Sequence, residues 1–194
     1  MMTNEFPFRE FTPKRTYVGR VYKRYKTYKK HLIKDFKSKC GYTDTSDRWF
    51  GGKNNFHIDH FISKDEDPSL INKYSNLIYC CAYVNILKKH DKYINYLDPC
   101  DEDFNSHFYR DKQGTIYPSP SSAKAQYMHN KLQLGLKRYR IVWKLDKLLT
   151  SKEQLTQLMD TLPPNHPRYQ TLKDRYLIFS REFDKYLNYL HAEL

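Results

Sequence analysis

The sequence lacks the features that define several classes of protein. Its 194 residues contain no apolar run long enough to cross a membrane and no apolar segment of a secretory signal near the start. Four cysteines are too few for a disulfide-rich scaffold of this length. There are no internal repeats, so one domain, or one domain with an appendage, is expected. These absences favour a cytoplasmic protein with free thiols.

Acidic residues are also scarce where basic residues are most frequent. The chain has 34 Lys and Arg against 22 Asp and Glu, a formal net charge of +12. Residues 1–39 hold twelve of those basic residues and only three acids, Glu5, Glu10 and Asp35. Such an asymmetry indicates a polyanionic partner, either nucleic acid or an acidic membrane.

Residues 19–38 are predicted to form an amphipathic helix, because apolar and basic side chains separate with the period of an α-helix. The apolar arc holds Val21, Tyr22, Tyr25, Tyr28, Leu32, Ile33 and Phe36. The basic arc holds Arg20, Lys23, Arg24, Lys26, Lys30, Lys34 and Lys37, and only Lys29 falls outside it. One interpretation is a solvated basic face. Seven cations with no acid among them favour a surface that faces phosphates.

The middle of the chain predicts the order loop, strand, loop, strand, helix. Residues 40–55 are rich in turn formers, and residues 56–62 alternate as a short strand does. Residues 76–81 are a second short strand, and residues 82–93 have helical spacing. We therefore expect a small unit of two strands and one helix here.

The C-terminal part is expected to begin with a β-hairpin over residues 107–118, closed at Gly114. Three helices are predicted to follow, over residues 123–149, 150–162 and 167–192, the second starting with a capping-box pattern at Thr150 and Glu153. Two interpretations stay open for these helices. They brace the small central unit, which cannot bury much surface alone, or they form a docking surface for a partner protein.

The central segment carries the side-chain types that phosphodiester hydrolysis requires. The reaction needs a base that takes a proton from water, a task that histidine suits near neutral pH, and a divalent cation at the phosphate. Mg²⁺ accepts a few protein oxygens and keeps several waters, and Asp59 and Asn85 could supply such oxygens. His60 follows Asp59 but points to the other side of a strand. The alternative is a chance pairing of Asp59 with His60 at a strand end.

The same residues resemble the HNH (ββα-metal) endonucleases over about residues 39–95. The matching segments are Cys40–Thr43, Phe56–Ile62 and Ser75–Lys88. The resemblance implies an α+β fold in which a small ββα-metal unit is embedded in a mostly helical body. The chain would then divide into a basic arm and helix (1–38), a nuclease core (39–95) and a hairpin with C-terminal helices (96–194).

The resemblance also implies a role for each matching side chain. Asp59 and Asn85 would hold one Mg²⁺ or Mn²⁺, and His60 would be the general base. Asn76 would fix the loop and the base, and His57 would support the site. The candidate nucleic-acid-binding residues are Arg20, Lys23, Lys26, Lys30, Lys34, Lys64, Lys88 and Lys89. DNA is favoured over RNA as the substrate, and no membrane partner is expected.

Many HNH proteins carry two CxxC pairs that bind a structural zinc. Here the pairs read Cys40-Gly-Tyr-Thr43 and Cys81-Ala-Tyr-Val84, so each lacks its second cysteine. A tetrahedral zinc site needs four good ligands, and we therefore expect no structural zinc.

Three functional hypotheses follow. The first is an active metal-dependent endonuclease. The second is a non-catalytic nucleic-acid-binding module that keeps the ββα shape. The third is a nuclease effector that a partner ATPase switches on, because the region from Leu97 onward resembles small HNH proteins of Septu-type bacterial anti-phage systems.

Overall fold

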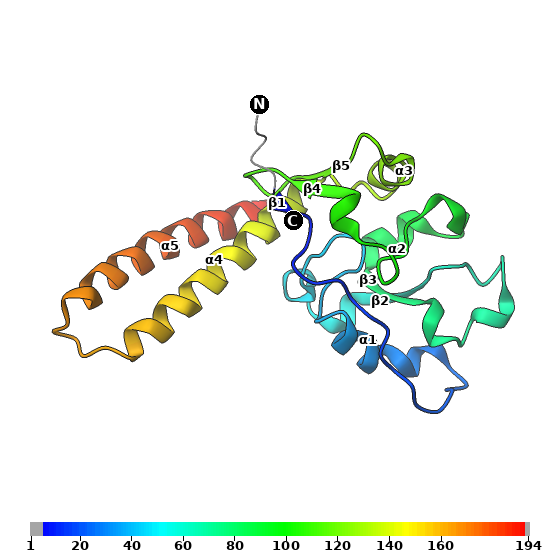
Figure 1. The fold of residues 1–194 in the computed structure, drawn as a ribbon, viewed down its shortest axis with the longest axis horizontal. Helices are drawn as coiled ribbons and strands as arrows, with labels where there is room; N and C mark the ends of the chain where they lie inside the picture. Colours follow the sequence, from blue (N-terminus) through cyan, green and yellow to red (C-terminus); the bar gives the residue numbers. More distant parts are fainter. Residues whose placement is uncertain (1–5, 193–194) are drawn as a thin grey trace. The chain divides into compact units, whose positions relative to one another are not determined.

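The structure is a computed structural model that describes residues 6–192, and its fold is α+β (Figure 1). The chain divides into two compact units, the first ending at Tyr139 and the second beginning at Arg140. The boundaries expected after residues 38 and 95 do not coincide with this division, because all three predicted segments contribute to the core of the first unit. No helix within residues 6–192 is both long and apolar enough to cross a membrane.

The centre of the first unit has the predicted order of strand, strand and helix. Strand β2 (Phe56–His60) pairs antiparallel with β3 (Leu77–Cys81), so that His57 lies opposite Cys80 and Asp59 opposite Ile78. Helix α2 (Ala82–Lys88) begins directly after β3. It is shorter than predicted, because Lys89 adopts a φ of 50° and turns the chain out of the helix.

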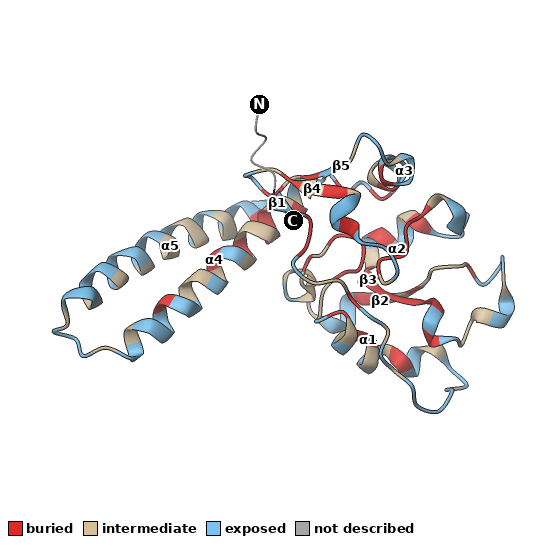
Figure 2. Ribbon diagram, in the orientation of Figure 1, coloured by how far each residue is buried: buried red, intermediate tan, exposed pale blue. Residues whose placement is uncertain are grey.

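Strand β3 is buried along its whole length, and this burial explains its apolar sequence (Figure 2). Short 3-10 helices surround the strand pair and set the entry to each strand. They are η2 (Asp47–Phe50), η3 (Lys53–Asn55), η4 (Pro68–Leu70), η5 (Tyr74–Asn76) and η6 (Tyr93–Asn95).

The N-terminal helix is half as long as predicted. Only η1 (Tyr25–Tyr28) and α1 (Lys29–Asp35) are helical, and residues 19–24 are not. The Tyr22 backbone N–H donates to the hydroxyl of Tyr28 at 3.0 Å, and the ring of Tyr22 stacks on Tyr17. This aromatic cluster holds the chain in a non-helical path, and Val21, which the helical pattern placed in the apolar arc, is 70% exposed.

The predicted hairpin is present, with β4 (Phe108–Arg110) and β5 (Ile116–Pro118) joined by a turn in which Gly114 has a φ of 86°. That φ favours glycine, which has no Cβ to clash. A third strand, β1 (Phe6–Pro7), pairs antiparallel with β4 and was not predicted. The 3-10 helix η7 (Phe104–Ser106) precedes the hairpin.

Arg110 of β4 is fully buried and joins three separate segments. Its guanidinium donates to the carbonyl oxygens of Phe8, Gly114 and Thr43 at 2.9, 2.9 and 2.8 Å. The side chain therefore connects the N-terminal strand, the hairpin turn and the turn after Cys40.

Replacing Arg110 with methionine is expected to lower the free energy of unfolding by at least about 3 kcal/mol. The substitution leaves three buried carbonyl groups without this donor, and each such loss costs about 1–3 kcal/mol. Urea unfolding followed by circular dichroism measures the change. Lys112→Met, at an exposed position of the same hairpin, is the matched control and should be near neutral. An Arg110→Met protein as stable as wild type would show that these three hydrogen bonds do not stabilise the fold.

The helical pattern after the hairpin was predicted incorrectly at two points. The expected helix over 123–149 is broken into α3 (Ala123–Lys131) and α4 (Lys137–Asp160). The break occurs because Leu132 and Leu134 turn into the core and Gln133 adopts a φ of 50°. Conversely, α4 passes through the predicted start at Thr150 without interruption, so the capping-box pattern there is not used as a cap.

The second unit is a pair of antiparallel helices, α4 from Arg140 onward and α5 (Pro167–Ala192), as Figure 1 shows. Ion pairing and ring contacts join them: Lys144 lies 3.9 Å from Glu182, and the Lys152 ammonium lies 4.8 Å from the centre of the Phe183 ring. The prediction of a last helix over 167–192 is confirmed.

Candidate active site

Two open hollows adjoin β2, and they share Tyr25, Ile58 and Asn85. The larger, of about 410 Å³, is called here the His57 hollow, and the smaller, of about 210 Å³, the His60 hollow. The His57 hollow is also lined by Lys26, Lys29, Asn54, Phe56 and His57. The His60 hollow is also lined by Asp59, His60, Ser63, Lys64, Lys89 and His90. The predicted catalytic and metal-binding residues of β2 and α2 therefore lie on one continuous surface.

His60 is held in one tautomer by the backbone. Its Nε2 lies 2.9 Å from the carbonyl oxygen of Ile71. A carbonyl oxygen can only accept a hydrogen bond, so Nε2 carries the proton and, in the neutral ring, Nδ1 keeps a free lone pair. The Tyr25 ring packs edge-on against the imidazole at 4.7 Å between centroids. The ring is thus oriented from two sides, with one nitrogen available as a base.

Asp59 is buried at the wall of the His60 hollow and has two protein partners. The Tyr42 hydroxyl donates to Oδ2 at 2.7 Å, and the Lys88 ammonium lies 3.1 Å from the same oxygen and 3.2 Å from Oδ1. Burial raises the pKa of the Asp59 carboxyl group, and the charge of Lys88 opposes this rise.

Lys88 has a different position from the one its sequence context predicted. It was expected near a phosphate, but its side chain is fully buried and its ammonium also donates to the carbonyl oxygens of His60 and Phe61 at 2.9 and 3.2 Å. A buried ammonium with these partners cannot reach a substrate at the surface. Lys88 instead neutralises Asp59 and fixes the end of β2.

Asn76 holds the chain that follows the base. Its Oδ1 accepts from the backbone N–H of Ile62 at 2.8 Å, and its Nδ2 donates to the carbonyl oxygen of the same residue at 2.9 Å. The Phe61 N–H also donates to the backbone oxygen of Asn76. The side chain is 5% exposed, so these bonds are protected from water. Asn76 thereby fixes the loop directly after His60.

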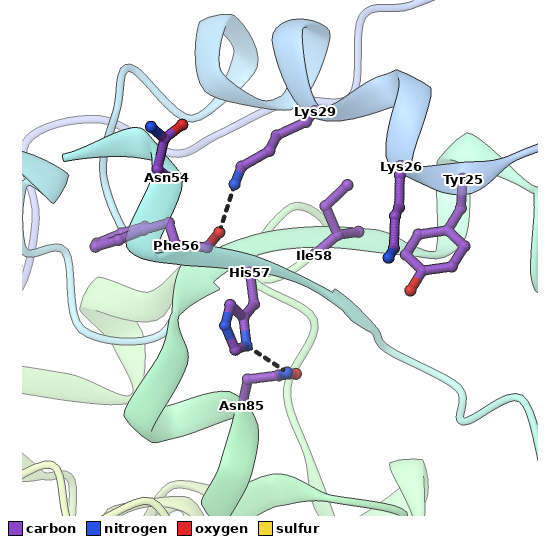
Figure 3. A pocket seen from close by; sticks show the side chains of 8 residues that line it. All are labelled: Tyr25, Lys26, Lys29, Asn54, Phe56, His57, Ile58 and Asn85. Carbon is purple, nitrogen blue, oxygen red and sulfur yellow. Dashed lines mark hydrogen bonds between the residues drawn. The ribbon is translucent and has the colours of Figure 1, made fainter. Parts of the chain in front are cut away.

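Asn85 and His57 face each other across the strand–helix junction (Figure 3). The Asn85 amide nitrogen donates to Nδ1 of His57 at 3.2 Å. The amide oxygen has no hydrogen-bonding partner among residues 6–192. Asn85, with this unpartnered oxygen, lines both hollows.

The donor set available for a cation is small. Within the described part of the chain, no three His, Cys, Asp or Glu side chains gather closely enough to hold a metal ion. The His60 hollow does hold one carboxylate, Asp59, and one free amide oxygen, Asn85. Two oxygens suit Mg²⁺ or Mn²⁺, which keep several bound waters, and the donors therefore fit a hydrated cation. Lys88 partly neutralises Asp59 and so weakens its attraction for that cation.

No family model, curated protein or solved structure matches this chain. A function for this chain must therefore be inferred from the residues and contacts of the two hollows.

The predicted basic residues separate into two groups. Lys26 lines the His57 hollow, and Lys64 and Lys89 line the His60 hollow. The others are exposed but line neither hollow: Arg20, Lys23, Lys30 and Lys34. Of the basic arc predicted within residues 19–38, Lys26 is therefore the residue that adjoins the site.

The positions of the lost CxxC pairs converge in the core. The sulfur atoms of Cys40 and Cys81 lie 3.9 Å apart, and both residues are buried. The Thr43 hydroxyl pairs instead with that of Thr45 at 2.7 Å, and Val84 is buried. Two sulfurs without further donors would leave a tetrahedral zinc incompletely bound. The absence of a structural zinc stays a prediction.

Sequence reasoning missed four residues that build the site. Tyr42 binds Asp59, and Tyr25, Lys29 and Asn54 line the His57 hollow. A signal existed only for Lys29, the one lysine outside the basic arc of the predicted helix. Its ammonium donates to the backbone oxygen of Phe56 at 2.7 Å, and burial lowers its pKa.

Proposed function

We propose that this chain is a metal-dependent endonuclease of the HNH type that hydrolyses phosphodiester bonds of nucleic acid, DNA in preference to RNA. The observation that carries the proposal is the hydrogen bond from Nε2 of His60 to the Ile71 carbonyl oxygen. It leaves Nδ1 as a fixed base at the surface of a hollow whose other walls carry cations.

In this proposal His60 takes a proton from the attacking water at Nδ1. The Ile71 carbonyl stabilises the imidazolium that forms, because it accepts the Nε2 proton throughout. Asn76 and Lys88 keep the backbone after His60 in place, so that the base does not move as the charge develops. Lys64 and Lys89 attract the phosphate that is to be cleaved.

Asp59 and Asn85 would hold one Mg²⁺ or Mn²⁺, with His57 beside Asn85 as a supporting residue. When bound, the cation would neutralise the phosphate and the leaving oxygen. The amide oxygen of Asn85 has no hydrogen-bonding partner among residues 6–192, whereas Asp59 must share its carboxylate with Lys88 and Tyr42. We therefore expect weak metal binding that strengthens when a substrate phosphate is present.

Purified protein is expected to nick supercoiled plasmid DNA in the presence of Mg²⁺ or Mn²⁺ and to lose this activity in EDTA. Gel electrophoresis of the relaxed and linear forms measures the reaction. Asn85→Ala should require a higher metal concentration, because it removes the free amide oxygen. Ile86→Ala, at an exposed neighbouring position of α2, is the matched control. Cleavage in EDTA at the rate seen with metal would contradict the proposal.

A second candidate keeps the same chemistry but adds a partner, such as an ATPase of an anti-phage system, that switches the nuclease on. The observation that favours it is the second unit, where Leu158, Leu177 and Ile178 are 51%, 46% and 61% exposed. Such apolar residues on a helical pair suit a protein interface. Activity that appears only in a co-purified complex would support this candidate. Salt-sensitive DNA binding without cleavage in any complex would instead support a non-catalytic binding module.

A further inference from the structure

The His57 hollow is the larger of the two, and only its Asn85 and His57 have a part in the proposed hydrolysis. Two ammonium groups line it, those of Lys26 and Lys29, and no carboxylate does. Neither lysine forms a salt bridge with an acidic side chain of residues 6–192. The hollow is thus a concave surface lined by two cations and no carboxylate, and Asp47, which does not line it, acts on Lys29 through its charge.

Lys29 is positioned rather than free to move. One N–H of its ammonium donates to the Phe56 carbonyl oxygen at 2.7 Å, which anchors the group beside β2. An ammonium has three donors, so two remain for a ligand. Figure 3 shows Lys26 reaching from η1 and Lys29 from α1 toward β2, with His57 and Asn85 on the opposite side of the strand. The two lysines therefore lie on one side of β2, and His57 and the proposed metal ligand Asn85 lie on the other.

The class of ligand follows from the fact that the two hollows share part of their lining. Tyr25, Ile58 and Asn85 line both hollows, so a chain that crosses Asn85 would occupy both. Tyr25 lines both hollows, and its hydroxyl has no hydrogen-bonding partner among the described residues. A nucleic acid strand carries a phosphate at every step, so its cleaved phosphate and the next one would fall in adjacent hollows.

We infer that the His57 hollow binds a second, uncleaved phosphate of the substrate strand through Lys26 and Lys29. The inference rests on the proposed nuclease function and names a subsite that positions the strand. Positioning a neighbouring phosphate fixes the register of the scissile bond against His60 without contact with the reacting atoms.

Binding tests this subsite without any cleavage. The affinity for a fluorescent single-stranded oligodeoxynucleotide is measured in EDTA over a range of salt concentrations. Lys26→Gln/Lys29→Gln should bind more weakly, with a salt slope reduced by about 0.7, the contribution of one phosphate on a single strand. Lys112→Gln/Lys124→Gln removes the same charge from exposed positions away from the hollow and should keep the wild-type slope. Equal slopes for the two double variants would overturn the subsite.

The double variant removes the hydrogen bond from Lys29 to the Phe56 backbone and could destabilise the fold. The single variant Lys26→Gln avoids this effect, because Lys26 is exposed. Its oligonucleotide affinity should fall while its melting temperature stays that of wild type. An unchanged affinity would count against the subsite.

A small chromogenic diester separates positioning from catalysis. Bis(p-nitrophenyl) phosphate has one phosphate and no neighbour, so the double variant should lose much less activity on it than on the oligonucleotide. An equal loss on both substrates would mean that the lysines act at the reacting phosphate, which overturns the subsite. If wild type cleaves neither substrate, the nuclease proposal fails, and the salt slope still decides whether the hollow binds phosphate.

Discussion

Replacing His60 with alanine is expected to lower the rate of DNA cleavage by about 10²–10⁴-fold, the usual contribution of a general base. The bond from Nε2 to the Ile71 oxygen makes Nδ1 the only ring nitrogen that can accept a proton. Alanine removes that acceptor without changing the lysines that attract the phosphate. The affinity for DNA in EDTA should therefore stay near that of wild type.

The chain offers a matched control in the same hollow. His90 also lines the His60 hollow, but it is exposed and pairs with Asp65 at 2.8 Å, so its imidazole is not held against the backbone. His90→Ala should cleave within a few-fold of wild type. Initial rates of plasmid nicking, with melting temperatures for each protein, separate loss of the base from loss of the fold. Equal activity of His60→Ala and wild type would remove the general base from the proposal.

Replacing Lys88 with methionine is expected to lower the free energy of unfolding by about 3–5 kcal/mol in the metal-free protein. The reason is that Asp59 would stay buried without its cation, and breaking a buried pair from one side has this cost. The ammonium also holds the carbonyl oxygens of His60 and Phe61, which would lose a donor. Lys89→Met changes the adjacent, exposed lysine and should be near neutral.

The pH dependence of this effect has a definite sign. Burial already raises the pKa of Asp59 above its value in the unfolded chain, and Lys88 limits that rise. A carboxyl group whose pKa is raised on folding stabilises the protein at low pH and ceases to do so as pH rises through the folded-state pKa. Without Lys88 the pKa should rise further. The stability difference between wild type and Lys88→Met should then be smallest at acidic pH and grow toward neutral pH.

Urea unfolding in EDTA at several pH values measures both effects. The double variant Asp59→Asn/Lys88→Met should recover part of the lost stability, because it removes the uncompensated charge as well. A Lys88→Met protein within about 0.5 kcal/mol of wild type would show that the pair contributes little, in the way that exposed pairs do.

Local patterns predicted the central elements well because their causes are local. The alternation of Phe56–His60 and the apolar run of Leu77–Cys81 each correspond to one strand, and α2 starts directly after the second. The spacing between Asp59 and Asn85 then follows from the antiparallel pairing and the immediate start of the helix. Asn76 lies at the entry to β3, where its side chain binds the backbone of Ile62 in the loop after His60, and its part in catalysis stays a prediction.

Helix boundaries were predicted less well because competing contacts decide them. Residues 19–24 have a helical pattern, but Tyr17, Tyr22 and Tyr28 pack together in a non-helical path. The break before α4 depends on Leu132 and Leu134 entering the core, and a periodicity plot does not distinguish that outcome from a continuous helix.

The sequence by itself determined the strand–strand–helix unit, the adjacency of Asp59 and His60, and the excess of positive charge near the start of the chain. Only the tertiary structure decided what each lysine does. Lys88 and Lys89 are neighbours in the sequence, yet one is buried against Asp59 and the other lines the His60 hollow. Lys29, outside the basic arc, reaches the site, while Lys30 and Lys34 do not line it. The physical reason is that the burial of a charged side chain depends on partners from distant segments, here the carboxylate of Asp59 and the backbone of Phe56, which no local pattern contains.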